Sequence, residues 1–281
     1  MESIILLTFL TALISSIASY VDKHLMNLGI SRKDYFYYMC LSMVPFSVFM
    51  IVIECITGNF KLEMSIIPII ALIFAMATRY FKQMSLAKMG QKLEVFENLS
   101  YMSLGIILSY IVDILIGIRD FNIWYVCFII IVLIGVFSLS NVKLRLKNLK
   151  KDLIIRIIGE VALGFIANII LRYWSNAFYI FILNALLTIV FSKNYSFNYH
   201  KKHKKIIKWV FIQQSFGFFY IYLYNYLSSI SVTTSNLVKP ITLVLSFIFA
   251  YFVRENKRKP KAKDFASLCL IVLGVVLLNM I

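Results

Sequence analysis

The sequence predicts an all-α polytopic membrane protein with ten transmembrane helices. Of its 281 residues, 61% are hydrophobic and only 15% are charged, whereas a soluble domain has roughly 45–50% apolar and about 25% charged residues. The apolar residues form continuous runs instead of alternating ones, which favours helices over a β-barrel. Because backbone polar groups in lipid must be hydrogen-bonded within their own segment, each run is expected to be a helix.

Ten apolar runs are long enough to cross a bilayer, which takes about 20 residues as a helix. The first run follows Met1-Glu2-Ser3, which lacks the basic segment and the cleavage site of a signal peptide, so a retained span is expected. The seventh run is the shortest. The ninth contains Pro240, which leaves the carbonyl of Asn236 without its helical partner and predicts a bend. The expected spans are residues 4–21, 35–57, 64–86, 94–116, 121–141, 153–174, 177–192, 206–228, 232–253 and 264–281.

Loop charges predict the orientation of these spans. Lys and Arg number 29 against 13 Asp and Glu, a net charge of +16. Loops that follow odd-numbered spans, counted together with Arg156 and Lys208 at the start of the next span, hold 23 of the 29, whereas the opposite side holds only Lys61, Arg119 and Arg172. The positive-inside rule then places the basic loops in the cytoplasm and both termini outside, in what we expect to be the plasma (inner) membrane. The same rule explains the positive charge without a nucleic-acid partner.

The two halves of the chain look alike. Residues 84–114 align with residues 225–255 without gaps, and each half closes with an apolar helix that contains glycine, at 126–140 and 267–281. Five spans is an odd number, so the second half must enter the membrane inverted relative to the first. This pattern predicts two inverted five-helix repeats, 1–142 and 143–281, with a substrate site near the membrane midplane between them.

At these residues the chain resembles the drug/metabolite transporter superfamily, in particular its ten-helix EamA-like members. The shared pattern is a turn of small and polar residues, an apolar helix with Pro near its start, a short charged loop and a last helix with glycine. Residues 228–281 carry it, with "VKP" at 238–240 and "RE" at 254–255, and the first half has "FEN" at 96–98 where the Pro would stand. The resemblance implies alternating access around a cavity lined by spans 1, 3, 4, 6, 8 and 9.

Two features depart from that family pattern. Most members are thought to keep both termini in the cytoplasm, whereas the loop charges here argue for the reverse, which leaves the direction of transport open. Spans 3, 4 and 9 also carry more charge than is typical of an amino-acid or drug exporter of the family, which bears on the substrate.

Ionisable residues deep in a span are candidates for function, because each costs a few kcal/mol to insert. Four stand out, namely Arg79, Glu97, Glu160 and Lys239. Arg79 and Lys239 are expected to bind an anionic group, such as a phosphate or a carboxylate. The alternative is that they pair with Glu97 or Glu160 and hold the bundle together.

Other charged side chains near the ends of spans have simpler explanations. Asp22 and Lys82 are expected to reach the interface, as are Lys88, Lys92 and Glu94. Glu54 is expected to cap the outer end of span 2. The cysteines form no CxxC pattern and are expected to be small buried hydrophobes, and the histidines lie in basic loops, so neither metal nor cofactor is predicted.

Uncharged polar residues supply further candidates. In span 8, Gln213 shares a face with Tyr220, and Gln214 shares one with Tyr224. We expect Gln214 and Tyr220 to face the cavity, although tyrosines near span ends also act as interfacial anchors. Asn168 in span 6 could bond a substrate or equally join two helices.

These observations predict a secondary transporter of a small polar metabolite that is anionic or zwitterionic. A proton or ion could be coupled through Glu97 or Glu160, and the chain has no GxxxxGK[ST] motif for ATP. One alternative is a flippase for a lipid-linked phosphate, such as a polyprenyl-phosphate sugar. A membrane enzyme is disfavoured, since no catalytic constellation stands out, and an anchoring subunit is left open. The expected partners are the substrate and the bilayer, with a homodimer left open.

Overall fold

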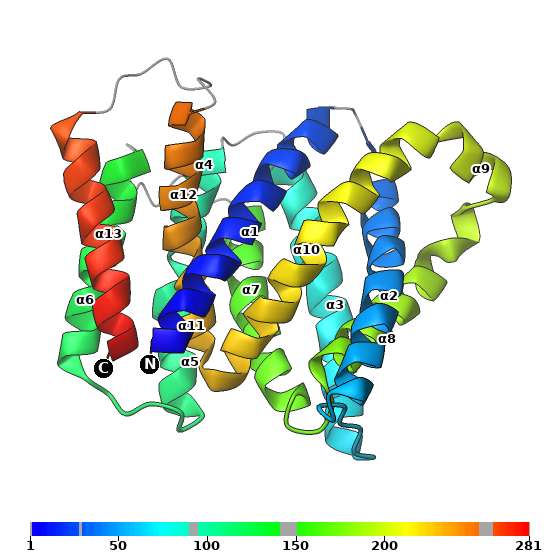
Figure 1. Ribbon diagram of the computed structural model, residues 1–281, viewed down its shortest axis with the longest axis horizontal. Helices are drawn as coiled ribbons and strands as arrows, with labels where there is room; N and C mark the ends of the chain where they lie inside the picture. The colour runs from blue at the N-terminus through cyan, green and yellow to red at the C-terminus, as the bar shows by residue number, and fades with distance from the viewer. Residues whose placement is uncertain (1, 28–29, 90–94, 141–150, 253–260, 281) are drawn as a thin grey trace.

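The computed structural model describes residues 2–27, 30–89, 95–140, 151–252 and 261–280, and the regular elements in these ranges are helices (Figure 1). They are α1 (Glu2–Asn27), α2 (Arg32–Ile56), α3 (Ile66–Met89), α4 (Val95–Met102), α5 (Gly105–Leu115), α6 (Ile123–Ser140), α7 (Lys151–Ile170), α8 (Asn176–Phe191), η2 (Ser192–Asn194), α9 (Phe197–Lys202), α10 (Lys204–Ile230), α11 (Val232–Asn236), α12 (Val238–Phe252) and α13 (Ala262–Met280). Ten stretches are long and apolar enough to cross a membrane, with α4–α5 and α11–α12 each counting as one. The prediction of an all-α polytopic membrane protein with ten spans is confirmed, to within a few residues at each boundary.

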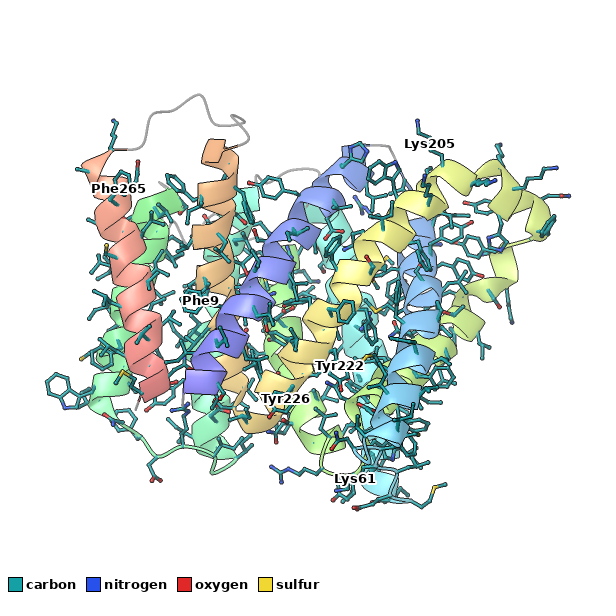
Figure 2. All side chains as sticks on the ribbon, in the orientation of Figure 1. Phe9, Lys61, Lys205, Tyr222, Tyr226 and Phe265 are labelled. Atoms are coloured by element: carbon teal, nitrogen blue, oxygen red, sulfur yellow. The ribbon has the colours of Figure 1, made fainter. Side chains whose placement is uncertain are left out.

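The bundle has two distinct ends. The start of α1 and the finish of α13 lie together at one end, which we call the terminal end (Figure 1). The short helix α9 lies at the opposite end, which we call the basic end because it carries Lys201, Lys202, Lys204 and Lys205 (Figure 2). Which of the two ends faces the cytoplasm stays a prediction. Of the charged residues expected at the interface, Lys88, Lys92 and Glu94 have side chains outside the described residues.

The spans pack in pairs that respect the proposed division of the chain. α6 packs on α13, α2 on α8, α3 on α7, α1 on α10, and the broken span α4–α5 on the broken span α11–α12. Exchanging every span of residues 1–142 with its counterpart in 143–281 leaves this set of pairs unchanged. The two inverted repeats stay a prediction, and this pairing is the arrangement they would produce.

The contact between α6 and α13 is reciprocal in detail. A Cβ atom added at Gly135 would lie 2.8 Å from Ile271, three residues before Gly274. One added at Gly274 would lie 2.6 Å from Val132, three residues before Gly135. Small residues let membrane helices approach closely enough for dispersion contacts to hold them together, since lipid supplies no hydrophobic driving force. The glycine-containing last helix of each half is therefore the partner of the other.

Two of the ten spans are interrupted by a short turn. The ninth splits after Asn236 and resumes at Val238, where the missing N–H of Pro240 predicted a bend. The fourth splits between Met102 and Gly105, which the sequence did not predict. The two breaks lie against each other, because a Cβ atom at Gly105 would be 3.3 Å from the amide oxygen of Asn236. Leu104 and Leu237 keep right-handed helical backbone angles, so both spans are locally irregular but not unwound.

An aromatic cluster attaches the loop after α8 to the basic end of α2. The ring of Tyr195 stacks on Tyr37 with centroids 3.9 Å apart, and its hydroxyl donates to Asp34 at 2.8 Å. Burial and this hydrogen bond to Asp34 raise the pKa of the Tyr195 phenol well above its usual value, so it remains a donor at neutral pH. Tyr38 also contacts His200, at 3.2 Å from Nδ1. The lysines that follow are thereby held at a defined place.

The four cysteines divide between the interior and the outer surface. Cys40 is buried as expected, but Cys55, Cys127 and Cys269 are exposed, so the expectation that all four are buried was wrong. The outside of a membrane bundle faces apolar lipid, where a small apolar side chain is as acceptable as in the core.

Candidate functional site

A cavity of about 170 Å³ lies in the middle of the bundle between α1, α2, α3, α7, α8, α10 and α12. Glu160, on its wall, is the tenth of the twenty residues of α7 and so stands near mid-depth. Among the described residues that line this cavity, four are cationic and two are carboxylic acids: Arg79, Lys82, Arg156, Lys239, Asp22 and Glu160. With ordinary ionisation the wall therefore carries two more positive charges than negative ones.

Glu160 joins three helices through its carboxylate. Lys239, at the start of α12, lies 2.7 Å from Oε1, and Lys82 of α3 forms an ion pair with Oε2. The hydroxyl of Tyr220 on α10 donates to Oε1 at 3.1 Å and accepts from the Lys239 ammonium at 2.7 Å. The Lys239 ammonium also stands 5.0 Å from the ring centroid of Tyr220, within the range of a cation–π contact. One carboxylate thus serves two ammonium groups.

Arg79 is the cation without a carboxylate partner. It is only 7% exposed, its Nη2 reaches the sulfur of Met43 at 3.4 Å, and its Nε has no hydrogen-bond partner. No ion pair involves it within the described part of the chain. A buried guanidinium in this condition carries a large desolvation cost. Its planar donor array suits a carboxylate or a phosphate better than any other ligand.

The remaining two charged residues stand toward the basic end of the cavity. Asp22 accepts from the hydroxyl of Tyr35 at 2.6 Å. Arg156 donates through Nη1 to Asn98, and its Nε has no hydrogen-bond partner. Arg156 was counted among the loop charges, but it is the sixth residue of α7 and faces the cavity.

Two expectations of interfacial side chains were wrong. Lys82 lies three residues after Arg79 in α3 and therefore shares its face of the helix, which turns it toward Glu160. Asp22 lines the cavity because Tyr35 of α2 holds its carboxylate there. In both cases a buried partner on another helix outweighs the tendency of a long or terminal side chain to reach the interface.

Five of the seven predicted site residues line this one cavity, namely Arg79, Glu160, Gln214, Tyr220 and Lys239. Glu97 and Asn168 are not among its lining residues. The side-chain amide of Asn168 donates to the carbonyls of Ser228 and Ser229 at 2.9 and 3.0 Å. Asn168 therefore joins α7 to α10, the second of its two predicted roles.

Lys239 and Arg79 differ in whether they pair with a carboxylate inside the bundle, which was the predicted alternative to binding an anionic group. Lys239 pairs internally with Glu160, whereas Arg79 does not pair with a described carboxylate. The face shared by Gln213 and Tyr220 does turn into the cavity, and the two glutamines also hydrogen-bond to each other. Tyr226, in contrast, lies near the terminal end of α10 and is half exposed (Figure 2).

Two carboxylates act as caps on helices of the other half of the chain. Asp113 is fully buried and accepts from the hydroxyl of Ser231 and from the N–H groups of Val232 and Thr233, at 2.7–2.9 Å. Sequence reasoning missed it, although an isolated aspartate in an apolar run is a signal. Glu54 was expected to cap its own helix, but it accepts from Ala177 N–H at 3.1 Å. The expectation was wrong because a carboxylate suits the positive N-terminus of α8, not the carbonyl end of α2.

The fold and the cavity define a polytopic integral membrane protein with a charged cavity at its centre. The sequence matches no protein-family model and has no significant match among curated proteins. Within the described residues, no group of three His, Cys, Asp or Glu side chains is placed to hold a metal ion.

Proposed function

We propose that this protein is a secondary transporter that carries a small anionic or zwitterionic metabolite through the central cavity. The observation that carries the proposal is Arg79, a buried guanidinium without a carboxylate partner in a cavity with two more cations than carboxylates. An ionisable residue inside a membrane is by default a candidate for a substrate or ion pathway. The protein then acts as a carrier and not as an enzyme.

The size of the cavity supports a small substrate. Pockets for drug-sized ligands have volumes of roughly 300–1,000 Å³, and this one is about 170 Å³. A metabolite of a few carbon atoms with one or two anionic groups fits that volume. A polyprenyl-phosphate sugar does not, which favours the metabolite carrier over the lipid flippase.

The arrangement of the helices supports alternating access. Two broken spans meet at Gly105 and Asn236, and the helix pairs have the symmetry expected of two inverted repeats. Transporters built in this way rock one repeat against the other around a site near the midplane. We further propose membership of the drug/metabolite transporter superfamily, with the basic end in the cytoplasm of a plasma membrane.

A ligand panel on the purified protein tests the proposal, because a ligand that binds the native state raises its melting temperature. Phosphorylated and carboxylated metabolites are compared with amines, neutral sugars and nucleosides, on wild type, Arg79→Gln and Arg172→Gln. Arg172 is exposed and lies outside the cavity, so it is the matched control.

We expect anions to stabilise wild type and Arg172→Gln alike. Arg79→Gln should need at least tenfold more anion for the same shift, since a charge-assisted hydrogen bond is worth about 1.5–3 kcal/mol. Stabilisation by amines or neutral compounds alone, or an equal response of Arg79→Gln, would contradict the proposal. A compound that passes is then tested for uptake into proteoliposomes.

A further inference from the structure

The carboxylate of Glu160 lies among side-chain donors that together form an anion-binding site. Its oxygens are met by the ammonium groups of Lys82 and Lys239 and by the hydroxyl of Tyr220. These three donors come from α3, α12 and α10, so they draw on both halves of the chain. None of them is specific for glutamate, because ammonium and phenol groups donate equally well to a substrate carboxylate or phosphate.

A second partner for Glu160 stands on its own helix. Arg156 precedes Glu160 by four residues in α7, so the two side chains share a face and come within reach of each other. The guanidinium bonds only Asn98 among the described residues, its Nε has no partner, and it interacts electrostatically with Glu160 across the cavity wall. With this spacing, a change of side-chain rotamer would let Arg156 replace the lysines as the partner of Glu160.

The charges of the cavity make such an exchange useful. Without Glu160, the buried ammonium of Lys239, the partly exposed one of Lys82 and the guanidinium of Arg79 would lack its compensating charge, which is costly in a medium of low dielectric constant. When an anionic group enters and pairs with the two lysines, the Glu160 carboxylate loses these partners. Arg156 can then form an ion pair with it. The same competition lets the substrate leave again, because its departure is balanced by the return of Glu160.

Resting on the proposed function, we propose that Glu160 is an internal counter-anion, which the anionic group of the substrate displaces from Lys82 and Lys239 toward Arg156. The substrate class this selects is a compound with a carboxylate or phosphate that can accept from two ammonium groups at once, with Arg79 beside them. Amines and neutral sugars cannot displace Glu160.

The test measures the concentration of anion that gives half of the maximal thermal stabilisation. Inorganic phosphate and succinate are the two probes, at constant ionic strength, and their comparison separates phosphate from carboxylate chemistry. Glu160→Gln removes the competing charge but keeps the shape of the side chain. Asp22→Asn is the matched control, because it removes the other carboxylate of the same cavity, which bonds Tyr35 and no lysine.

We expect Glu160→Gln to lower the half-maximal concentration at least tenfold for one probe, and Asp22→Asn to lower it less than threefold. Arg156→Gln should weaken anion binding in wild type but not in the Glu160→Gln background. In that background no displaced carboxylate needs Arg156 as a partner. Equal effects of Glu160→Gln and Asp22→Asn would mean that Glu160 acts only through the electrostatic field of a negative charge in the cavity, and would overturn the inference. So would equal effects of Arg156→Gln in the two backgrounds.

Glu160→Asp covers the case in which the glutamine variant does not fold. Its charge is kept, but its shorter side chain cannot bridge both lysines, so we expect an intermediate gain in anion affinity. A response equal to that of wild type would overturn the inference. If wild type responds to anions and Arg79→Gln does not, the proposed function stands whatever the Glu160 variants do. If neither wild type nor any Glu160 variant responds to either probe, both proposals fall.

Discussion

Two buried carboxylates show how differently this bundle uses the same chemical group. Asp113 and Glu160 are 0% and 4% exposed, and each accepts from three donors. Two donors to Asp113 are backbone N–H groups at the start of α11, and the third is the Ser231 hydroxyl beside them. The donors to Glu160 are the ends of two lysines and a tyrosine, on three different helices.

The difference lies in what can move. A helix N-terminus cannot withdraw its N–H groups without unwinding, so the donors to Asp113 at the start of α11 are fixed in place. Lysine side chains have several rotatable bonds, and the cavity beside them gives room for another anion. The chain therefore has neutral, fixed donors where Asp113 joins α5 to α11, and charged, mobile donors beside the cavity where the proposed substrate would bind.

The largest effect is expected from breaking the fixed junction. Asp113→Asn places an amide NH₂ against N–H donors and leaves one or two of them unsatisfied, which lowers the free energy of unfolding by about 3 kcal/mol. Glu160→Gln removes the charge that pairs with Lys82 and Lys239, but it keeps an acceptor for them, and the ammonium groups border a polar cavity. It should therefore lower the free energy of unfolding by less, about 2 kcal/mol. Thermal unfolding of both variants in detergent measures the contrast.

The exposed Asp120 supplies the control, since Asp120→Asn should leave the melting temperature unchanged. A loss for Glu160→Gln as large as that for Asp113→Asn would show that both carboxylates are structural joints, and the contrast between the two regions would disappear.

A smaller effect is expected where shape and not charge holds two helices. Gly135→Ala would bring a methyl group to 3.0 Å from the backbone oxygen of Ser267 and to 2.8 Å from Ile271. The forced separation of α6 and α13 should lower the free energy of unfolding by about 2 kcal/mol. Because this contact is remote from the cavity, the response to anions in the ligand panel should not change. A changed anion response would link the α6–α13 pair to the site, and Ile134→Ala on the lipid-facing side of α6 is the control.

The smallest effect is expected to have the opposite sign. Arg79→Met removes a buried charge that pairs with no described carboxylate, so the free energy of unfolding without ligand should rise by about 1 kcal/mol. The same variant should lose its stabilisation by anions, which is the trade of stability against function found at binding sites. A melting temperature below that of wild type would mean that Arg79 stabilises the packing of the helices. Arg172→Met, outside the cavity, controls for the loss of an arginine.

Much of the site was predictable because charged residues are rare in transmembrane spans and are therefore easily recognised within apolar runs of the sequence. Arg79, Glu160 and Lys239 stand out from apolar runs, and Gln214 and Tyr220 stand out by their spacing on one helix. Asp22, Lys82 and Arg156 did not stand out, because each lies near a span end, where interfacial placement is the ordinary outcome. Only a partner on another helix, such as Tyr35 or Glu160, turns such a residue inward.

The sequence by itself determined the class of the protein and its division into spans. Continuous apolar runs, basic loops and a proline in the ninth span report on local free energies of transfer and of hydrogen bonding, which depend on neighbours along the chain. Only the tertiary structure decided which charges meet. Whether Lys239 pairs with Glu160 and whether Arg79 lacks a carboxylate partner depend on how α3, α7, α10 and α12 pack around one cavity. Which helix Asp113 caps depends on how α5 packs against α11. Those contacts join residues far apart in the chain, 118 positions for Asp113 and Ser231, and no local pattern encodes such a pairing.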